Sequence, residues 1–264
     1  SQVDDKNTNN NQQITSKEAF INWQKEINSI DINTGARYIE HSKFNNETVY
    51  NLGIAKYLDK GVKLTSTYST AFTAPSLAQI NAVATLEPET SKNIELGIEK
   101  TYDWGVVDVR TYTNKIENAF RSDDTTSWAW TNIGKLTTKG IEVSVSANIN
   151  NYDLDFSHSY NESRAHDETT QAIRRPKNMT NLTLSKQYAK FNSKMQIIKK
   201  SSSLDAGNVE LAGYTLLNLS TQYQVNNNAK ASLTVNNATD KDYTVANGFN
   251  QFGRTVSLGL DYNF

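Results

Sequence analysis

The sequence contains no cysteine and only three prolines among its 264 residues. The lack of cysteine excludes a disulfide framework, a cysteine-ligated zinc site and a cysteine nucleophile. Proline interrupts the hydrogen bonding of a central strand, so its scarcity fits long uninterrupted strands. The length allows one large all-β domain or two domains of ordinary size.

An excess of either charge is also missing. Lysine and arginine number 27, aspartate and glutamate number 28, and the formal net charge is −1. A general nucleic-acid binder carries a basic excess, so we expect no nucleic-acid partner.

Long apolar runs are absent, and the mean hydropathy is −0.63. No apolar run approaches the ~18 residues of a membrane-spanning helix. A membrane β-strand, however, needs only about 9–11 residues, of which alternate ones face lipid. An average over both faces therefore does not exclude a membrane barrel.

What the chain does have is alternation of apolar and polar residues. In the last strand, Val256, Leu258 and Leu260 alternate with Ser257, Gly259 and Asp261. Successive strand side chains point to opposite faces, so this strand has one apolar and one polar face. The sharpest further examples are 94–99, 141–149, 153–160, 217–223 and 230–235, and weaker ones are 15–26, 30–41, 47–57, 62–72, 106–118, 178–188 and 191–200. The pattern predicts an all-β fold with about thirteen strands.

Residues 16–27 are ambiguous. Ala19, Ile21 and Trp23 have strand spacing, whereas Phe20, Trp23 and Ile27 fit one face of a helix. We favour a strand because the surrounding segments are strands. Residues 1–13 are polar and rich in asparagine, with no charged-then-apolar signal segment, and we expect an extracellular loop or terminus there.

The connections between the expected strands alternate between two lengths. The short ones are 26–30, 58–61, 102–105, 150–152, 189–191 and 225–228; the longer ones are 41–47, 73–91, 121–132, 164–177, 201–213 and 239–252. An antiparallel up-and-down transmembrane β-barrel of an outer membrane has this asymmetry, with tight periplasmic turns and longer extracellular loops. Residues 14–264 are therefore expected to be barrel.

Two further observations favour a barrel in lipid. Aromatic residues stand beside the short turns, where a barrel has its interfacial girdle: Tyr57, Tyr102, Trp104, Tyr152, Tyr188, Phe191, Tyr223, Tyr262 and Phe264. The alternative is that aromatics simply end strands in any β-protein. The polar faces carry Glu95, Glu142, Asp153 and Asp155, which a dry core would not tolerate. They suit a water-filled lumen or a polar plug.

Four stretches resemble TonB-dependent outer-membrane receptors. They read STAFTAPSL with LEPETS at 69–77 and 86–91, NIGK with KGIE at 132–135 and 139–142, IRRP at 173–176, and NATDKDY with GRT at 237–243 and 253–255. Together they cover roughly residues 47–264. Within the family, APSLAQ at 74–79 and GFNQ at 248–251 are similar to cobalamin receptors, although siderophore and haem receptors share most of these signatures.

The resemblance implies a 22-stranded barrel around an N-terminal plug that this chain does not show, so the chain is expected to be the C-terminal part of the barrel. It implies active import of cobalamin to the periplasm, coupled to TonB–ExbB–ExbD through the missing plug, in the outer membrane of a Gram-negative bacterium. Expected partners are lipid, lipopolysaccharide and the upstream half of the receptor. The alternatives are a siderophore or haem receptor, a passive porin, and a soluble β-sandwich binding module.

The resemblance and the loop positions together nominate binding residues, and we expect no enzyme chemistry. Arg174 matches an arginine that faces the ligand in cobalamin receptors; the alternative is a surface arginine facing lipopolysaccharide. Trp128 and Trp130 could pack on a macrocycle or belong to the outer girdle. Further candidates in the last loop are Tyr243 and Phe249.

Metal sites are weakly indicated. Asp123 and Asp124 could hold Ca²⁺ with help from carbonyl oxygens. The resemblance places the family's calcium in the part of the receptor that is missing here, so no cofactor is expected in this segment. His41, His158 and His166 lie far apart in sequence, and solvated or interfacial histidines are expected.

Overall fold

The computed structural model describes residues 2–3, 14–122, 129–165 and 169–263. Trp128, Asp123, Asp124 and His166, and most of the expected N-terminal loop, lie outside these residues. No helix in the described part is long and apolar enough to cross a membrane.

Strands dominate the described residues, as the alternation predicts. The long strands are β2 (Ile14–Ile27), β3 (Ile30–His41), β4 (Glu47–Leu58), β5 (Val62–Thr73), β6 (Glu89–Tyr102), β7 (Gly105–Glu117), β10 (Leu136–Ile149), β11 (Tyr152–Ala165), β13 (Asn178–Tyr188), β14 (Phe191–Lys200), β17 (Tyr214–Gln224), β18 (Ala229–Asn236) and β21 (Thr255–Tyr262). Each covers one of the thirteen expected strands. The ambiguous segment at 16–27 lies in β2 and is a strand, as predicted.

The remaining elements are short. They are β1 (Gln2–Val3), η1 (Asp59–Gly61), α1 (Leu77–Ala82), β8 (Phe120–Arg121), β9 (Thr131–Asn132), β12 (Thr170–Gln171), β15 (Ser203–Leu204), η3 (Ala206–Asn208), β16 (Glu210–Leu211), β19 (Thr244–Ala246) and β20 (Phe249–Asn250). Most of them lie in the longer connections, where the sequence predicts only loops.

The long strands follow one another in the sheet in chain order, from β1 and β2 to β21. Neighbouring strands such as β2 and β3, β13 and β14, and β18 and β21 pair antiparallel. The chain divides into two compact units. Unit 1 comprises Ser1–Ile98, Thr111–Lys139 and Glu162–Ala172. Unit 2 comprises Glu99–Arg110, Gly140–Asn161 and Ile173–Phe264. The all-β antiparallel fold is therefore confirmed.

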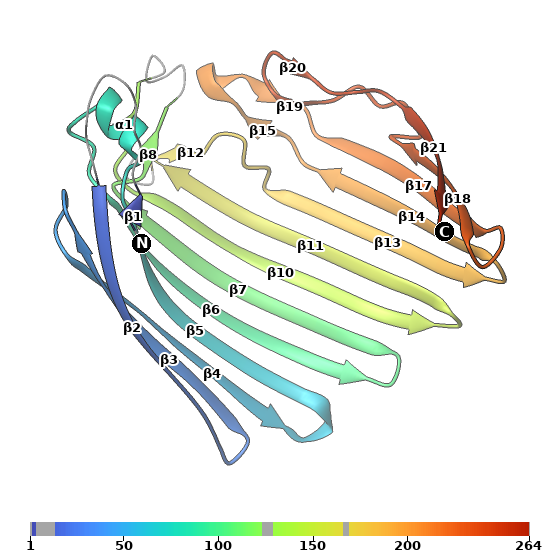
Figure 1. Ribbon diagram of the computed structural model, residues 1–264, viewed down its shortest axis with the longest axis horizontal. Helices are drawn as coiled ribbons and strands as arrows, with labels where there is room; N and C mark the ends of the chain where they lie inside the picture. The colour runs from blue at the N-terminus through green and yellow to red at the C-terminus, as the bar shows by residue number, and fades with distance from the viewer. Residues whose placement is uncertain (1, 4–13, 123–128, 166–168, 264) are drawn as a thin grey trace. The chain divides into compact units, whose positions relative to one another are not determined.

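In unit 2, β11, β13, β14, β17, β18 and β21 follow one another in the sheet (Figure 1). Their residues show the clearest division into two faces. Directly paired residues of antiparallel strands project to the same face. Two apolar rows cross these strands, and we call them the apolar belt: Leu154–Leu184–Met195–Leu219–Val235–Val256 and Phe156–Leu182–Ile197–Leu217. Polar rows occupy the other face: Asp153–Ser185–Lys194–Ser220–Thr234–Ser257 and Asp155–Thr183–Gln196–Asn218.

The apolar face is not packed into a core. Val256, Leu258 and Leu260 are 62%, 83% and 73% exposed. A soluble sandwich would bury these side chains against a second sheet. The arrangement is the one that the sequence predicts for strands whose apolar side faces lipid.

Unit 1 repeats the division in β2 to β5. One row reads Trp23–Thr34–Leu52–Tyr68, and the neighbouring row on the other face reads Asn22–Gly35–Asn51–Ser69. The short turns of each unit follow alternate strands of an antiparallel meander, so they lie at one end of the strands and the longer connections at the other.

Gly105 offers a test of the tight packing at a short turn. A Cβ atom there would collide with the backbone carbonyl oxygen of Ser146 and lie 2.7 Å from the Cα atom of Ala147. Because backbone atoms cannot swing away, we expect Gly105→Ala to lower the free energy of unfolding by about 1–3 kcal/mol. Urea titration of the folded barrel in detergent would measure this loss.

Gly53→Ala is the matched control, because a Cβ there would meet nothing closer than 3.8 Å. Equal stability of the two variants would contradict the close approach at Gly105.

Candidate functional site

Three loop segments of unit 2 meet at the carboxylate of Asp205, whose side chain is 0% exposed. Its Oδ1 atom accepts hydrogen bonds from Arg174 Nε at 2.6 Å and from the Ala206 amide at 2.8 Å. Its Oδ2 atom accepts one from the Asn247 amide at 2.6 Å. We call this arrangement the Asp205 lock, because it ties segments 173–177, 201–213 and 237–254 together.

Backbone hydrogen bonds reinforce the Asp205 lock. The Arg174 amide donates to the Leu204 carbonyl at 2.6 Å, and the Asp205 amide donates to the Val209 carbonyl at 2.7 Å. Asp205 also caps the short helix η3, which begins at Ala206. A buried carboxylate is tolerated only when it is hydrogen-bonded or paired, and here both conditions hold.

The pKa of the Asp205 carboxyl reflects these opposing influences. Burial by itself would raise the pKa, but the amides of Asn247 and Ala206 and the Arg174 guanidinium favour the charged form. The net result is a pKa below the usual value of an aspartate. The carboxylate is therefore ionised under ordinary conditions.

Arg174, the arginine expected to face a ligand, is thus part of the Asp205 lock. It has a left-handed backbone conformation, with a φ angle of 55°, and its amide donates a hydrogen bond to the Leu204 carbonyl. The Nε edge of its guanidinium contacts Asp205, while the side chain remains 42% exposed. A ligand contact through the exposed part remains a prediction.

Tyr243, another predicted binding residue, lies against Tyr214 with ring centroids 4.6 Å apart and planes at 43°. Lys200 lies over the Tyr214 ring, 6.0 Å from its centroid. Tyr214 and Lys200 are directly paired across β14 and β17, so they share the polar face. Two aromatic rings and a cation therefore gather where this face meets the last loop.

The last loop, 237–254, is held by side chains at its base. The Asn237 side chain bonds both the amide and the carbonyl of Lys241, each at 2.9 Å. The Arg254 amide donates to Asp240 Oδ1 at 2.7 Å. Phe249, a predicted binding residue in this loop, is 67% exposed, and Phe252 is 87% exposed. The loop presents apolar rings to the surroundings.

The loops of unit 1 are braced around Asn132. Its side chain exchanges hydrogen bonds with the Glu87 amide and carbonyl, each at 3.0 Å, and donates to the Asn118 carbonyl at 2.6 Å. Glu89 accepts from the Phe120 amide at 2.8 Å. The motif residues at 86–91 and 132–135 thus lie together, although 45 positions separate Glu87 from Asn132.

Trp130, a predicted ligand contact or girdle residue, is half-buried in unit 1. Its ring packs edge-on against Phe120, with centroids 6.4 Å apart. Neither of its two expected roles is tested by this contact.

The described residues hold no group of three or more His, Asp or Glu side chains arranged for a metal ion. His41 Nδ1 accepts from the amides of Lys43 and Phe44, each at 3.2 Å. His158 shares a 2.8 Å hydrogen bond with Thr180 on the apolar face.

Sequence reasoning missed Asp205, Tyr214 and Lys200. The run Asp-Ala-Gly-Asn at 205–208 signals a turn, but nothing local shows that its carboxylate is buried. Two of the three hydrogen-bond partners of Asp205 are Arg174 and Asn247, which lie 31 and 42 positions away. Only the strand order brings them together.

Comparison with known proteins agrees with this fold. Residues 1–238 match the family model described as "TonB dependent receptor-like, beta-barrel". The curated protein "Vitamin B12 transporter BtuB" of Photobacterium profundum is 23% identical, with 99% of this chain and 44% of that protein covered.

Solved structures show the same fold. The ferric enterobactin receptor PfeA of Pseudomonas aeruginosa superposes with a TM-score of 0.83 at 18% identity, over 96% of this chain and 45% of that one. P. aeruginosa FpvA, solved with bound pyoverdines, gives a TM-score of 0.77 at 16% identity, over 95% of this chain and 38% of that one.

The chain spans less than half the length of the curated relatives that it matches. The family match nevertheless covers residues 1–238 of this chain. These residues include Asn132 with its partners in unit 1, and Arg174 and Asp205 of the Asp205 lock. The resemblance drawn from the sequence motifs is confirmed, and the chain belongs to the TonB dependent receptor-like β-barrel family.

Proposed function

We propose that this chain is the C-terminal part of the barrel of an active transporter in the outer membrane of a Gram-negative bacterium. The observation that carries the proposal is the apolar face of these strands, on which Leu219, Val256, Leu258 and Leu260 are exposed, opposite polar rows on the same strands. Such a sheet is stable in lipid when its polar face lines an aqueous lumen. Family membership supports the same assignment.

The proposed ligand is cobalamin. It is supported by relatives named as vitamin B12 transporters that match 87–99% of this chain at 23% identity. A second candidate is a ferric siderophore, favoured by superposition on the ferric enterobactin receptor and on FpvA. Both ligands are large and carry many polar groups around a metal-bearing centre.

The ligand would bind at the loop end of the strands. Tyr243 on Tyr214 offers a flat apolar surface, and Phe249 adds an exposed ring from the same loop. The exposed part of Arg174 can donate to amide or phosphate oxygens of a corrinoid. The Asp205 lock holds these loops before binding, which reduces the entropy lost on association.

Energy for uptake would come from TonB, ExbB and ExbD, acting through a plug domain encoded upstream of this chain. Strands encoded upstream of this chain would complete the barrel. Calcium, if the receptor uses it, would be held in that upstream part. Sequencing the gene upstream of Ser1 tests this directly, because the absence of a plug would favour a passive porin.

Binding measurements on the complete receptor test the ligand. We expect cyanocobalamin to bind and Tyr243→Ala to weaken its binding up to about tenfold, the contribution of one aromatic stacking contact. Isothermal titration calorimetry in detergent would measure both dissociation constants, with ferric enterobactin titrated in parallel.

Tyr188→Ala is the control, because Tyr188 is 72% exposed beside a short turn at the opposite end of the strands. A receptor that binds ferric enterobactin and shows no affinity for cobalamin would replace the proposed ligand with the siderophore.

A further inference from the structure

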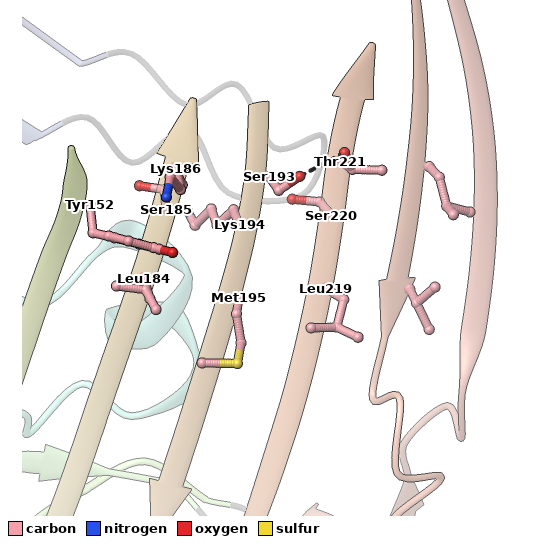
Figure 2. A pocket seen from close by; sticks show the side chains of 12 residues that line it. Tyr152, Leu184, Ser185, Lys186, Ser193, Lys194, Met195, Leu219, Ser220 and Thr221 are labelled. Atoms are coloured by element: carbon pink, nitrogen blue, oxygen red, sulfur yellow. Dashed lines mark hydrogen bonds between the residues drawn. The ribbon is translucent and has the colours of Figure 1, made fainter. Parts of the chain in front are cut away.

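A groove of about 390 Å³ opens on the apolar face of unit 2, across β11, β13, β14, β17 and β18 (Figure 2). Two rows of directly paired residues line most of it, and Ser185, Lys194 and Ser220, at the positions between these rows, complete the lining. The first row is Tyr152–Lys186–Ser193–Thr221–Leu233, and the second is Leu184–Met195–Leu219–Val235 from the apolar belt. The volume is within the range of small-molecule sites, roughly 300–1,000 Å³.

Small side chains create the groove. Ser193 and Thr221 interrupt the first row between the longer Lys186 and Leu233, and their hydroxyls share a 2.9 Å hydrogen bond (Figure 2). Leucine or isoleucine at these two positions would fill the space. The groove therefore has an apolar row on one side and a hydroxyl pair with a lysine on the other.

Lys186 is an unusual residue for this face. Its ammonium lies over the Tyr152 ring, 3.9 Å from the centroid. On the apolar face, the described pairs that run from Tyr152–Tyr160 of β11 across to β21 contain no aspartate or glutamate. A lysine on a lipid-facing surface is tolerated near the membrane interface, and an anionic lipid headgroup there would complement its charge.

The level of Lys186 indicates which part of a lipid lies beside it. The aromatic row Tyr188–Phe191–Tyr223 is two residues closer to the short turns. Aromatic rows mark the membrane–water boundary, and a lysine just inside that boundary extends its ammonium towards the headgroups. The second row of the groove continues from this level into the apolar belt.

We propose that this groove binds an anionic phospholipid, with its phosphate against Lys186 and one acyl chain along Leu184, Met195 and Leu219. The hydroxyls of Ser193 and Thr221 face the glycerol region. This inference rests on the proposed location in a membrane. It adds a lipid site on the outer side of the barrel, separate from the ligand site at the loops.

Native mass spectrometry of the complete receptor with added phosphatidylglycerol or phosphatidylcholine tests the site. We expect preferential retention of phosphatidylglycerol, which Lys186→Gln weakens about fivefold, the effect of removing one lysine near an anionic headgroup. Ser193→Leu keeps the charge but fills the groove, and it should also reduce retention.

Lys100→Gln is the matched control. Lys100 lies over Tyr102, 5.2 Å from its ring centroid, near another short turn, but it does not line this groove. Equal loss in Lys100→Gln and Lys186→Gln, or equal retention of both lipids by the unaltered receptor, would overturn the lipid site. If the lipid site were overturned but ligand uptake were normal, the proposed function would still hold. Recovery of the receptor in the soluble fraction would overturn both the lipid site and the proposed function.

Discussion

Replacing Asp205 with alanine is expected to release three loops at once. The change removes the acceptor for Arg174 Nε and for the amides of Ala206 and Asn247. A hydrogen bond to a charged acceptor contributes about 1.5–3 kcal/mol, so its loss makes local opening roughly ten to a hundred times more frequent. Hydrogen–deuterium exchange of segments 201–213 and 237–254 in the complete receptor would show the loss of protection.

Ligand affinity should fall with the loss of the Asp205 lock, because the loops must then be ordered during binding. Asp242→Ala is the matched control, since Asp242 is an exposed aspartate in the same last loop. Asp205→Asn keeps the shape of the side chain without its charge and should give an intermediate effect. Unchanged exchange in Asp205→Ala would contradict the role assigned to the lock.

The same carboxylate determines how the loops respond to acid. Its pKa in the folded protein lies below the unfolded value of 3.8. A group with a depressed pKa stabilises the folded state fully above the unfolded value, and this stabilisation is lost as the pH falls through the folded value. The loops should therefore stay closed at neutral pH and open only below about pH 4, and this acid response should be absent in Asp205→Ala.

The strands of this chain could be predicted because apolar and polar residues alternate within the sequence of each strand. In β13 and β14, Leu182, Leu184 and Met195 alternate with polar neighbours, and this pattern can be read without knowing which strands pair. The strand pairing then places these residues on one face. The ambiguous segment at 16–27 was predicted to be a strand because its neighbours are strands, and it lies in β2. The turns at 150–151 and 189–190 were predicted from the breaks in the alternation. Asn150, Asn151 and Ala189 adopt positive φ angles there, a conformation that asparagine favours more than alanine.

The loop clusters could not be predicted in the same way. Arg174, Tyr243 and Phe249 were chosen by position and resemblance, and the structure shows two of them in contacts with Asp205 and Tyr214. Those contacts join residues 29–31 positions apart, and no periodic pattern encodes them. Short elements such as α1 were not predicted because they are too short to show a periodic pattern. The capping box of Ser76 and Gln79 begins a helix of only six residues.

The apolar belt gives the prediction with the largest effect on insertion. Leu182 lies in the row Phe156–Leu182–Ile197–Leu217, in the interior of the belt. An arginine at the middle of a lipid-facing surface costs about 2–4 kcal/mol. Leu182→Arg should therefore lower the free energy of folding into lipid vesicles by that amount. Urea titration of the complete receptor in vesicles, followed by the gel shift of the folded barrel, would measure it.

Thr183→Arg provides a control one residue away on the same strand. Thr183 belongs to the polar row and is directly paired with Asp155, so an arginine there has water and a carboxylate beside it. It should fold almost as well as the unaltered receptor, because the two faces differ in their surroundings and not in their backbone. If the two arginines were equally tolerated, both faces would meet water, and the sheet could not be the wall of a membrane barrel. If Thr183→Arg were the more damaging, the polar face would be the buried one, and the transport function would fail with it.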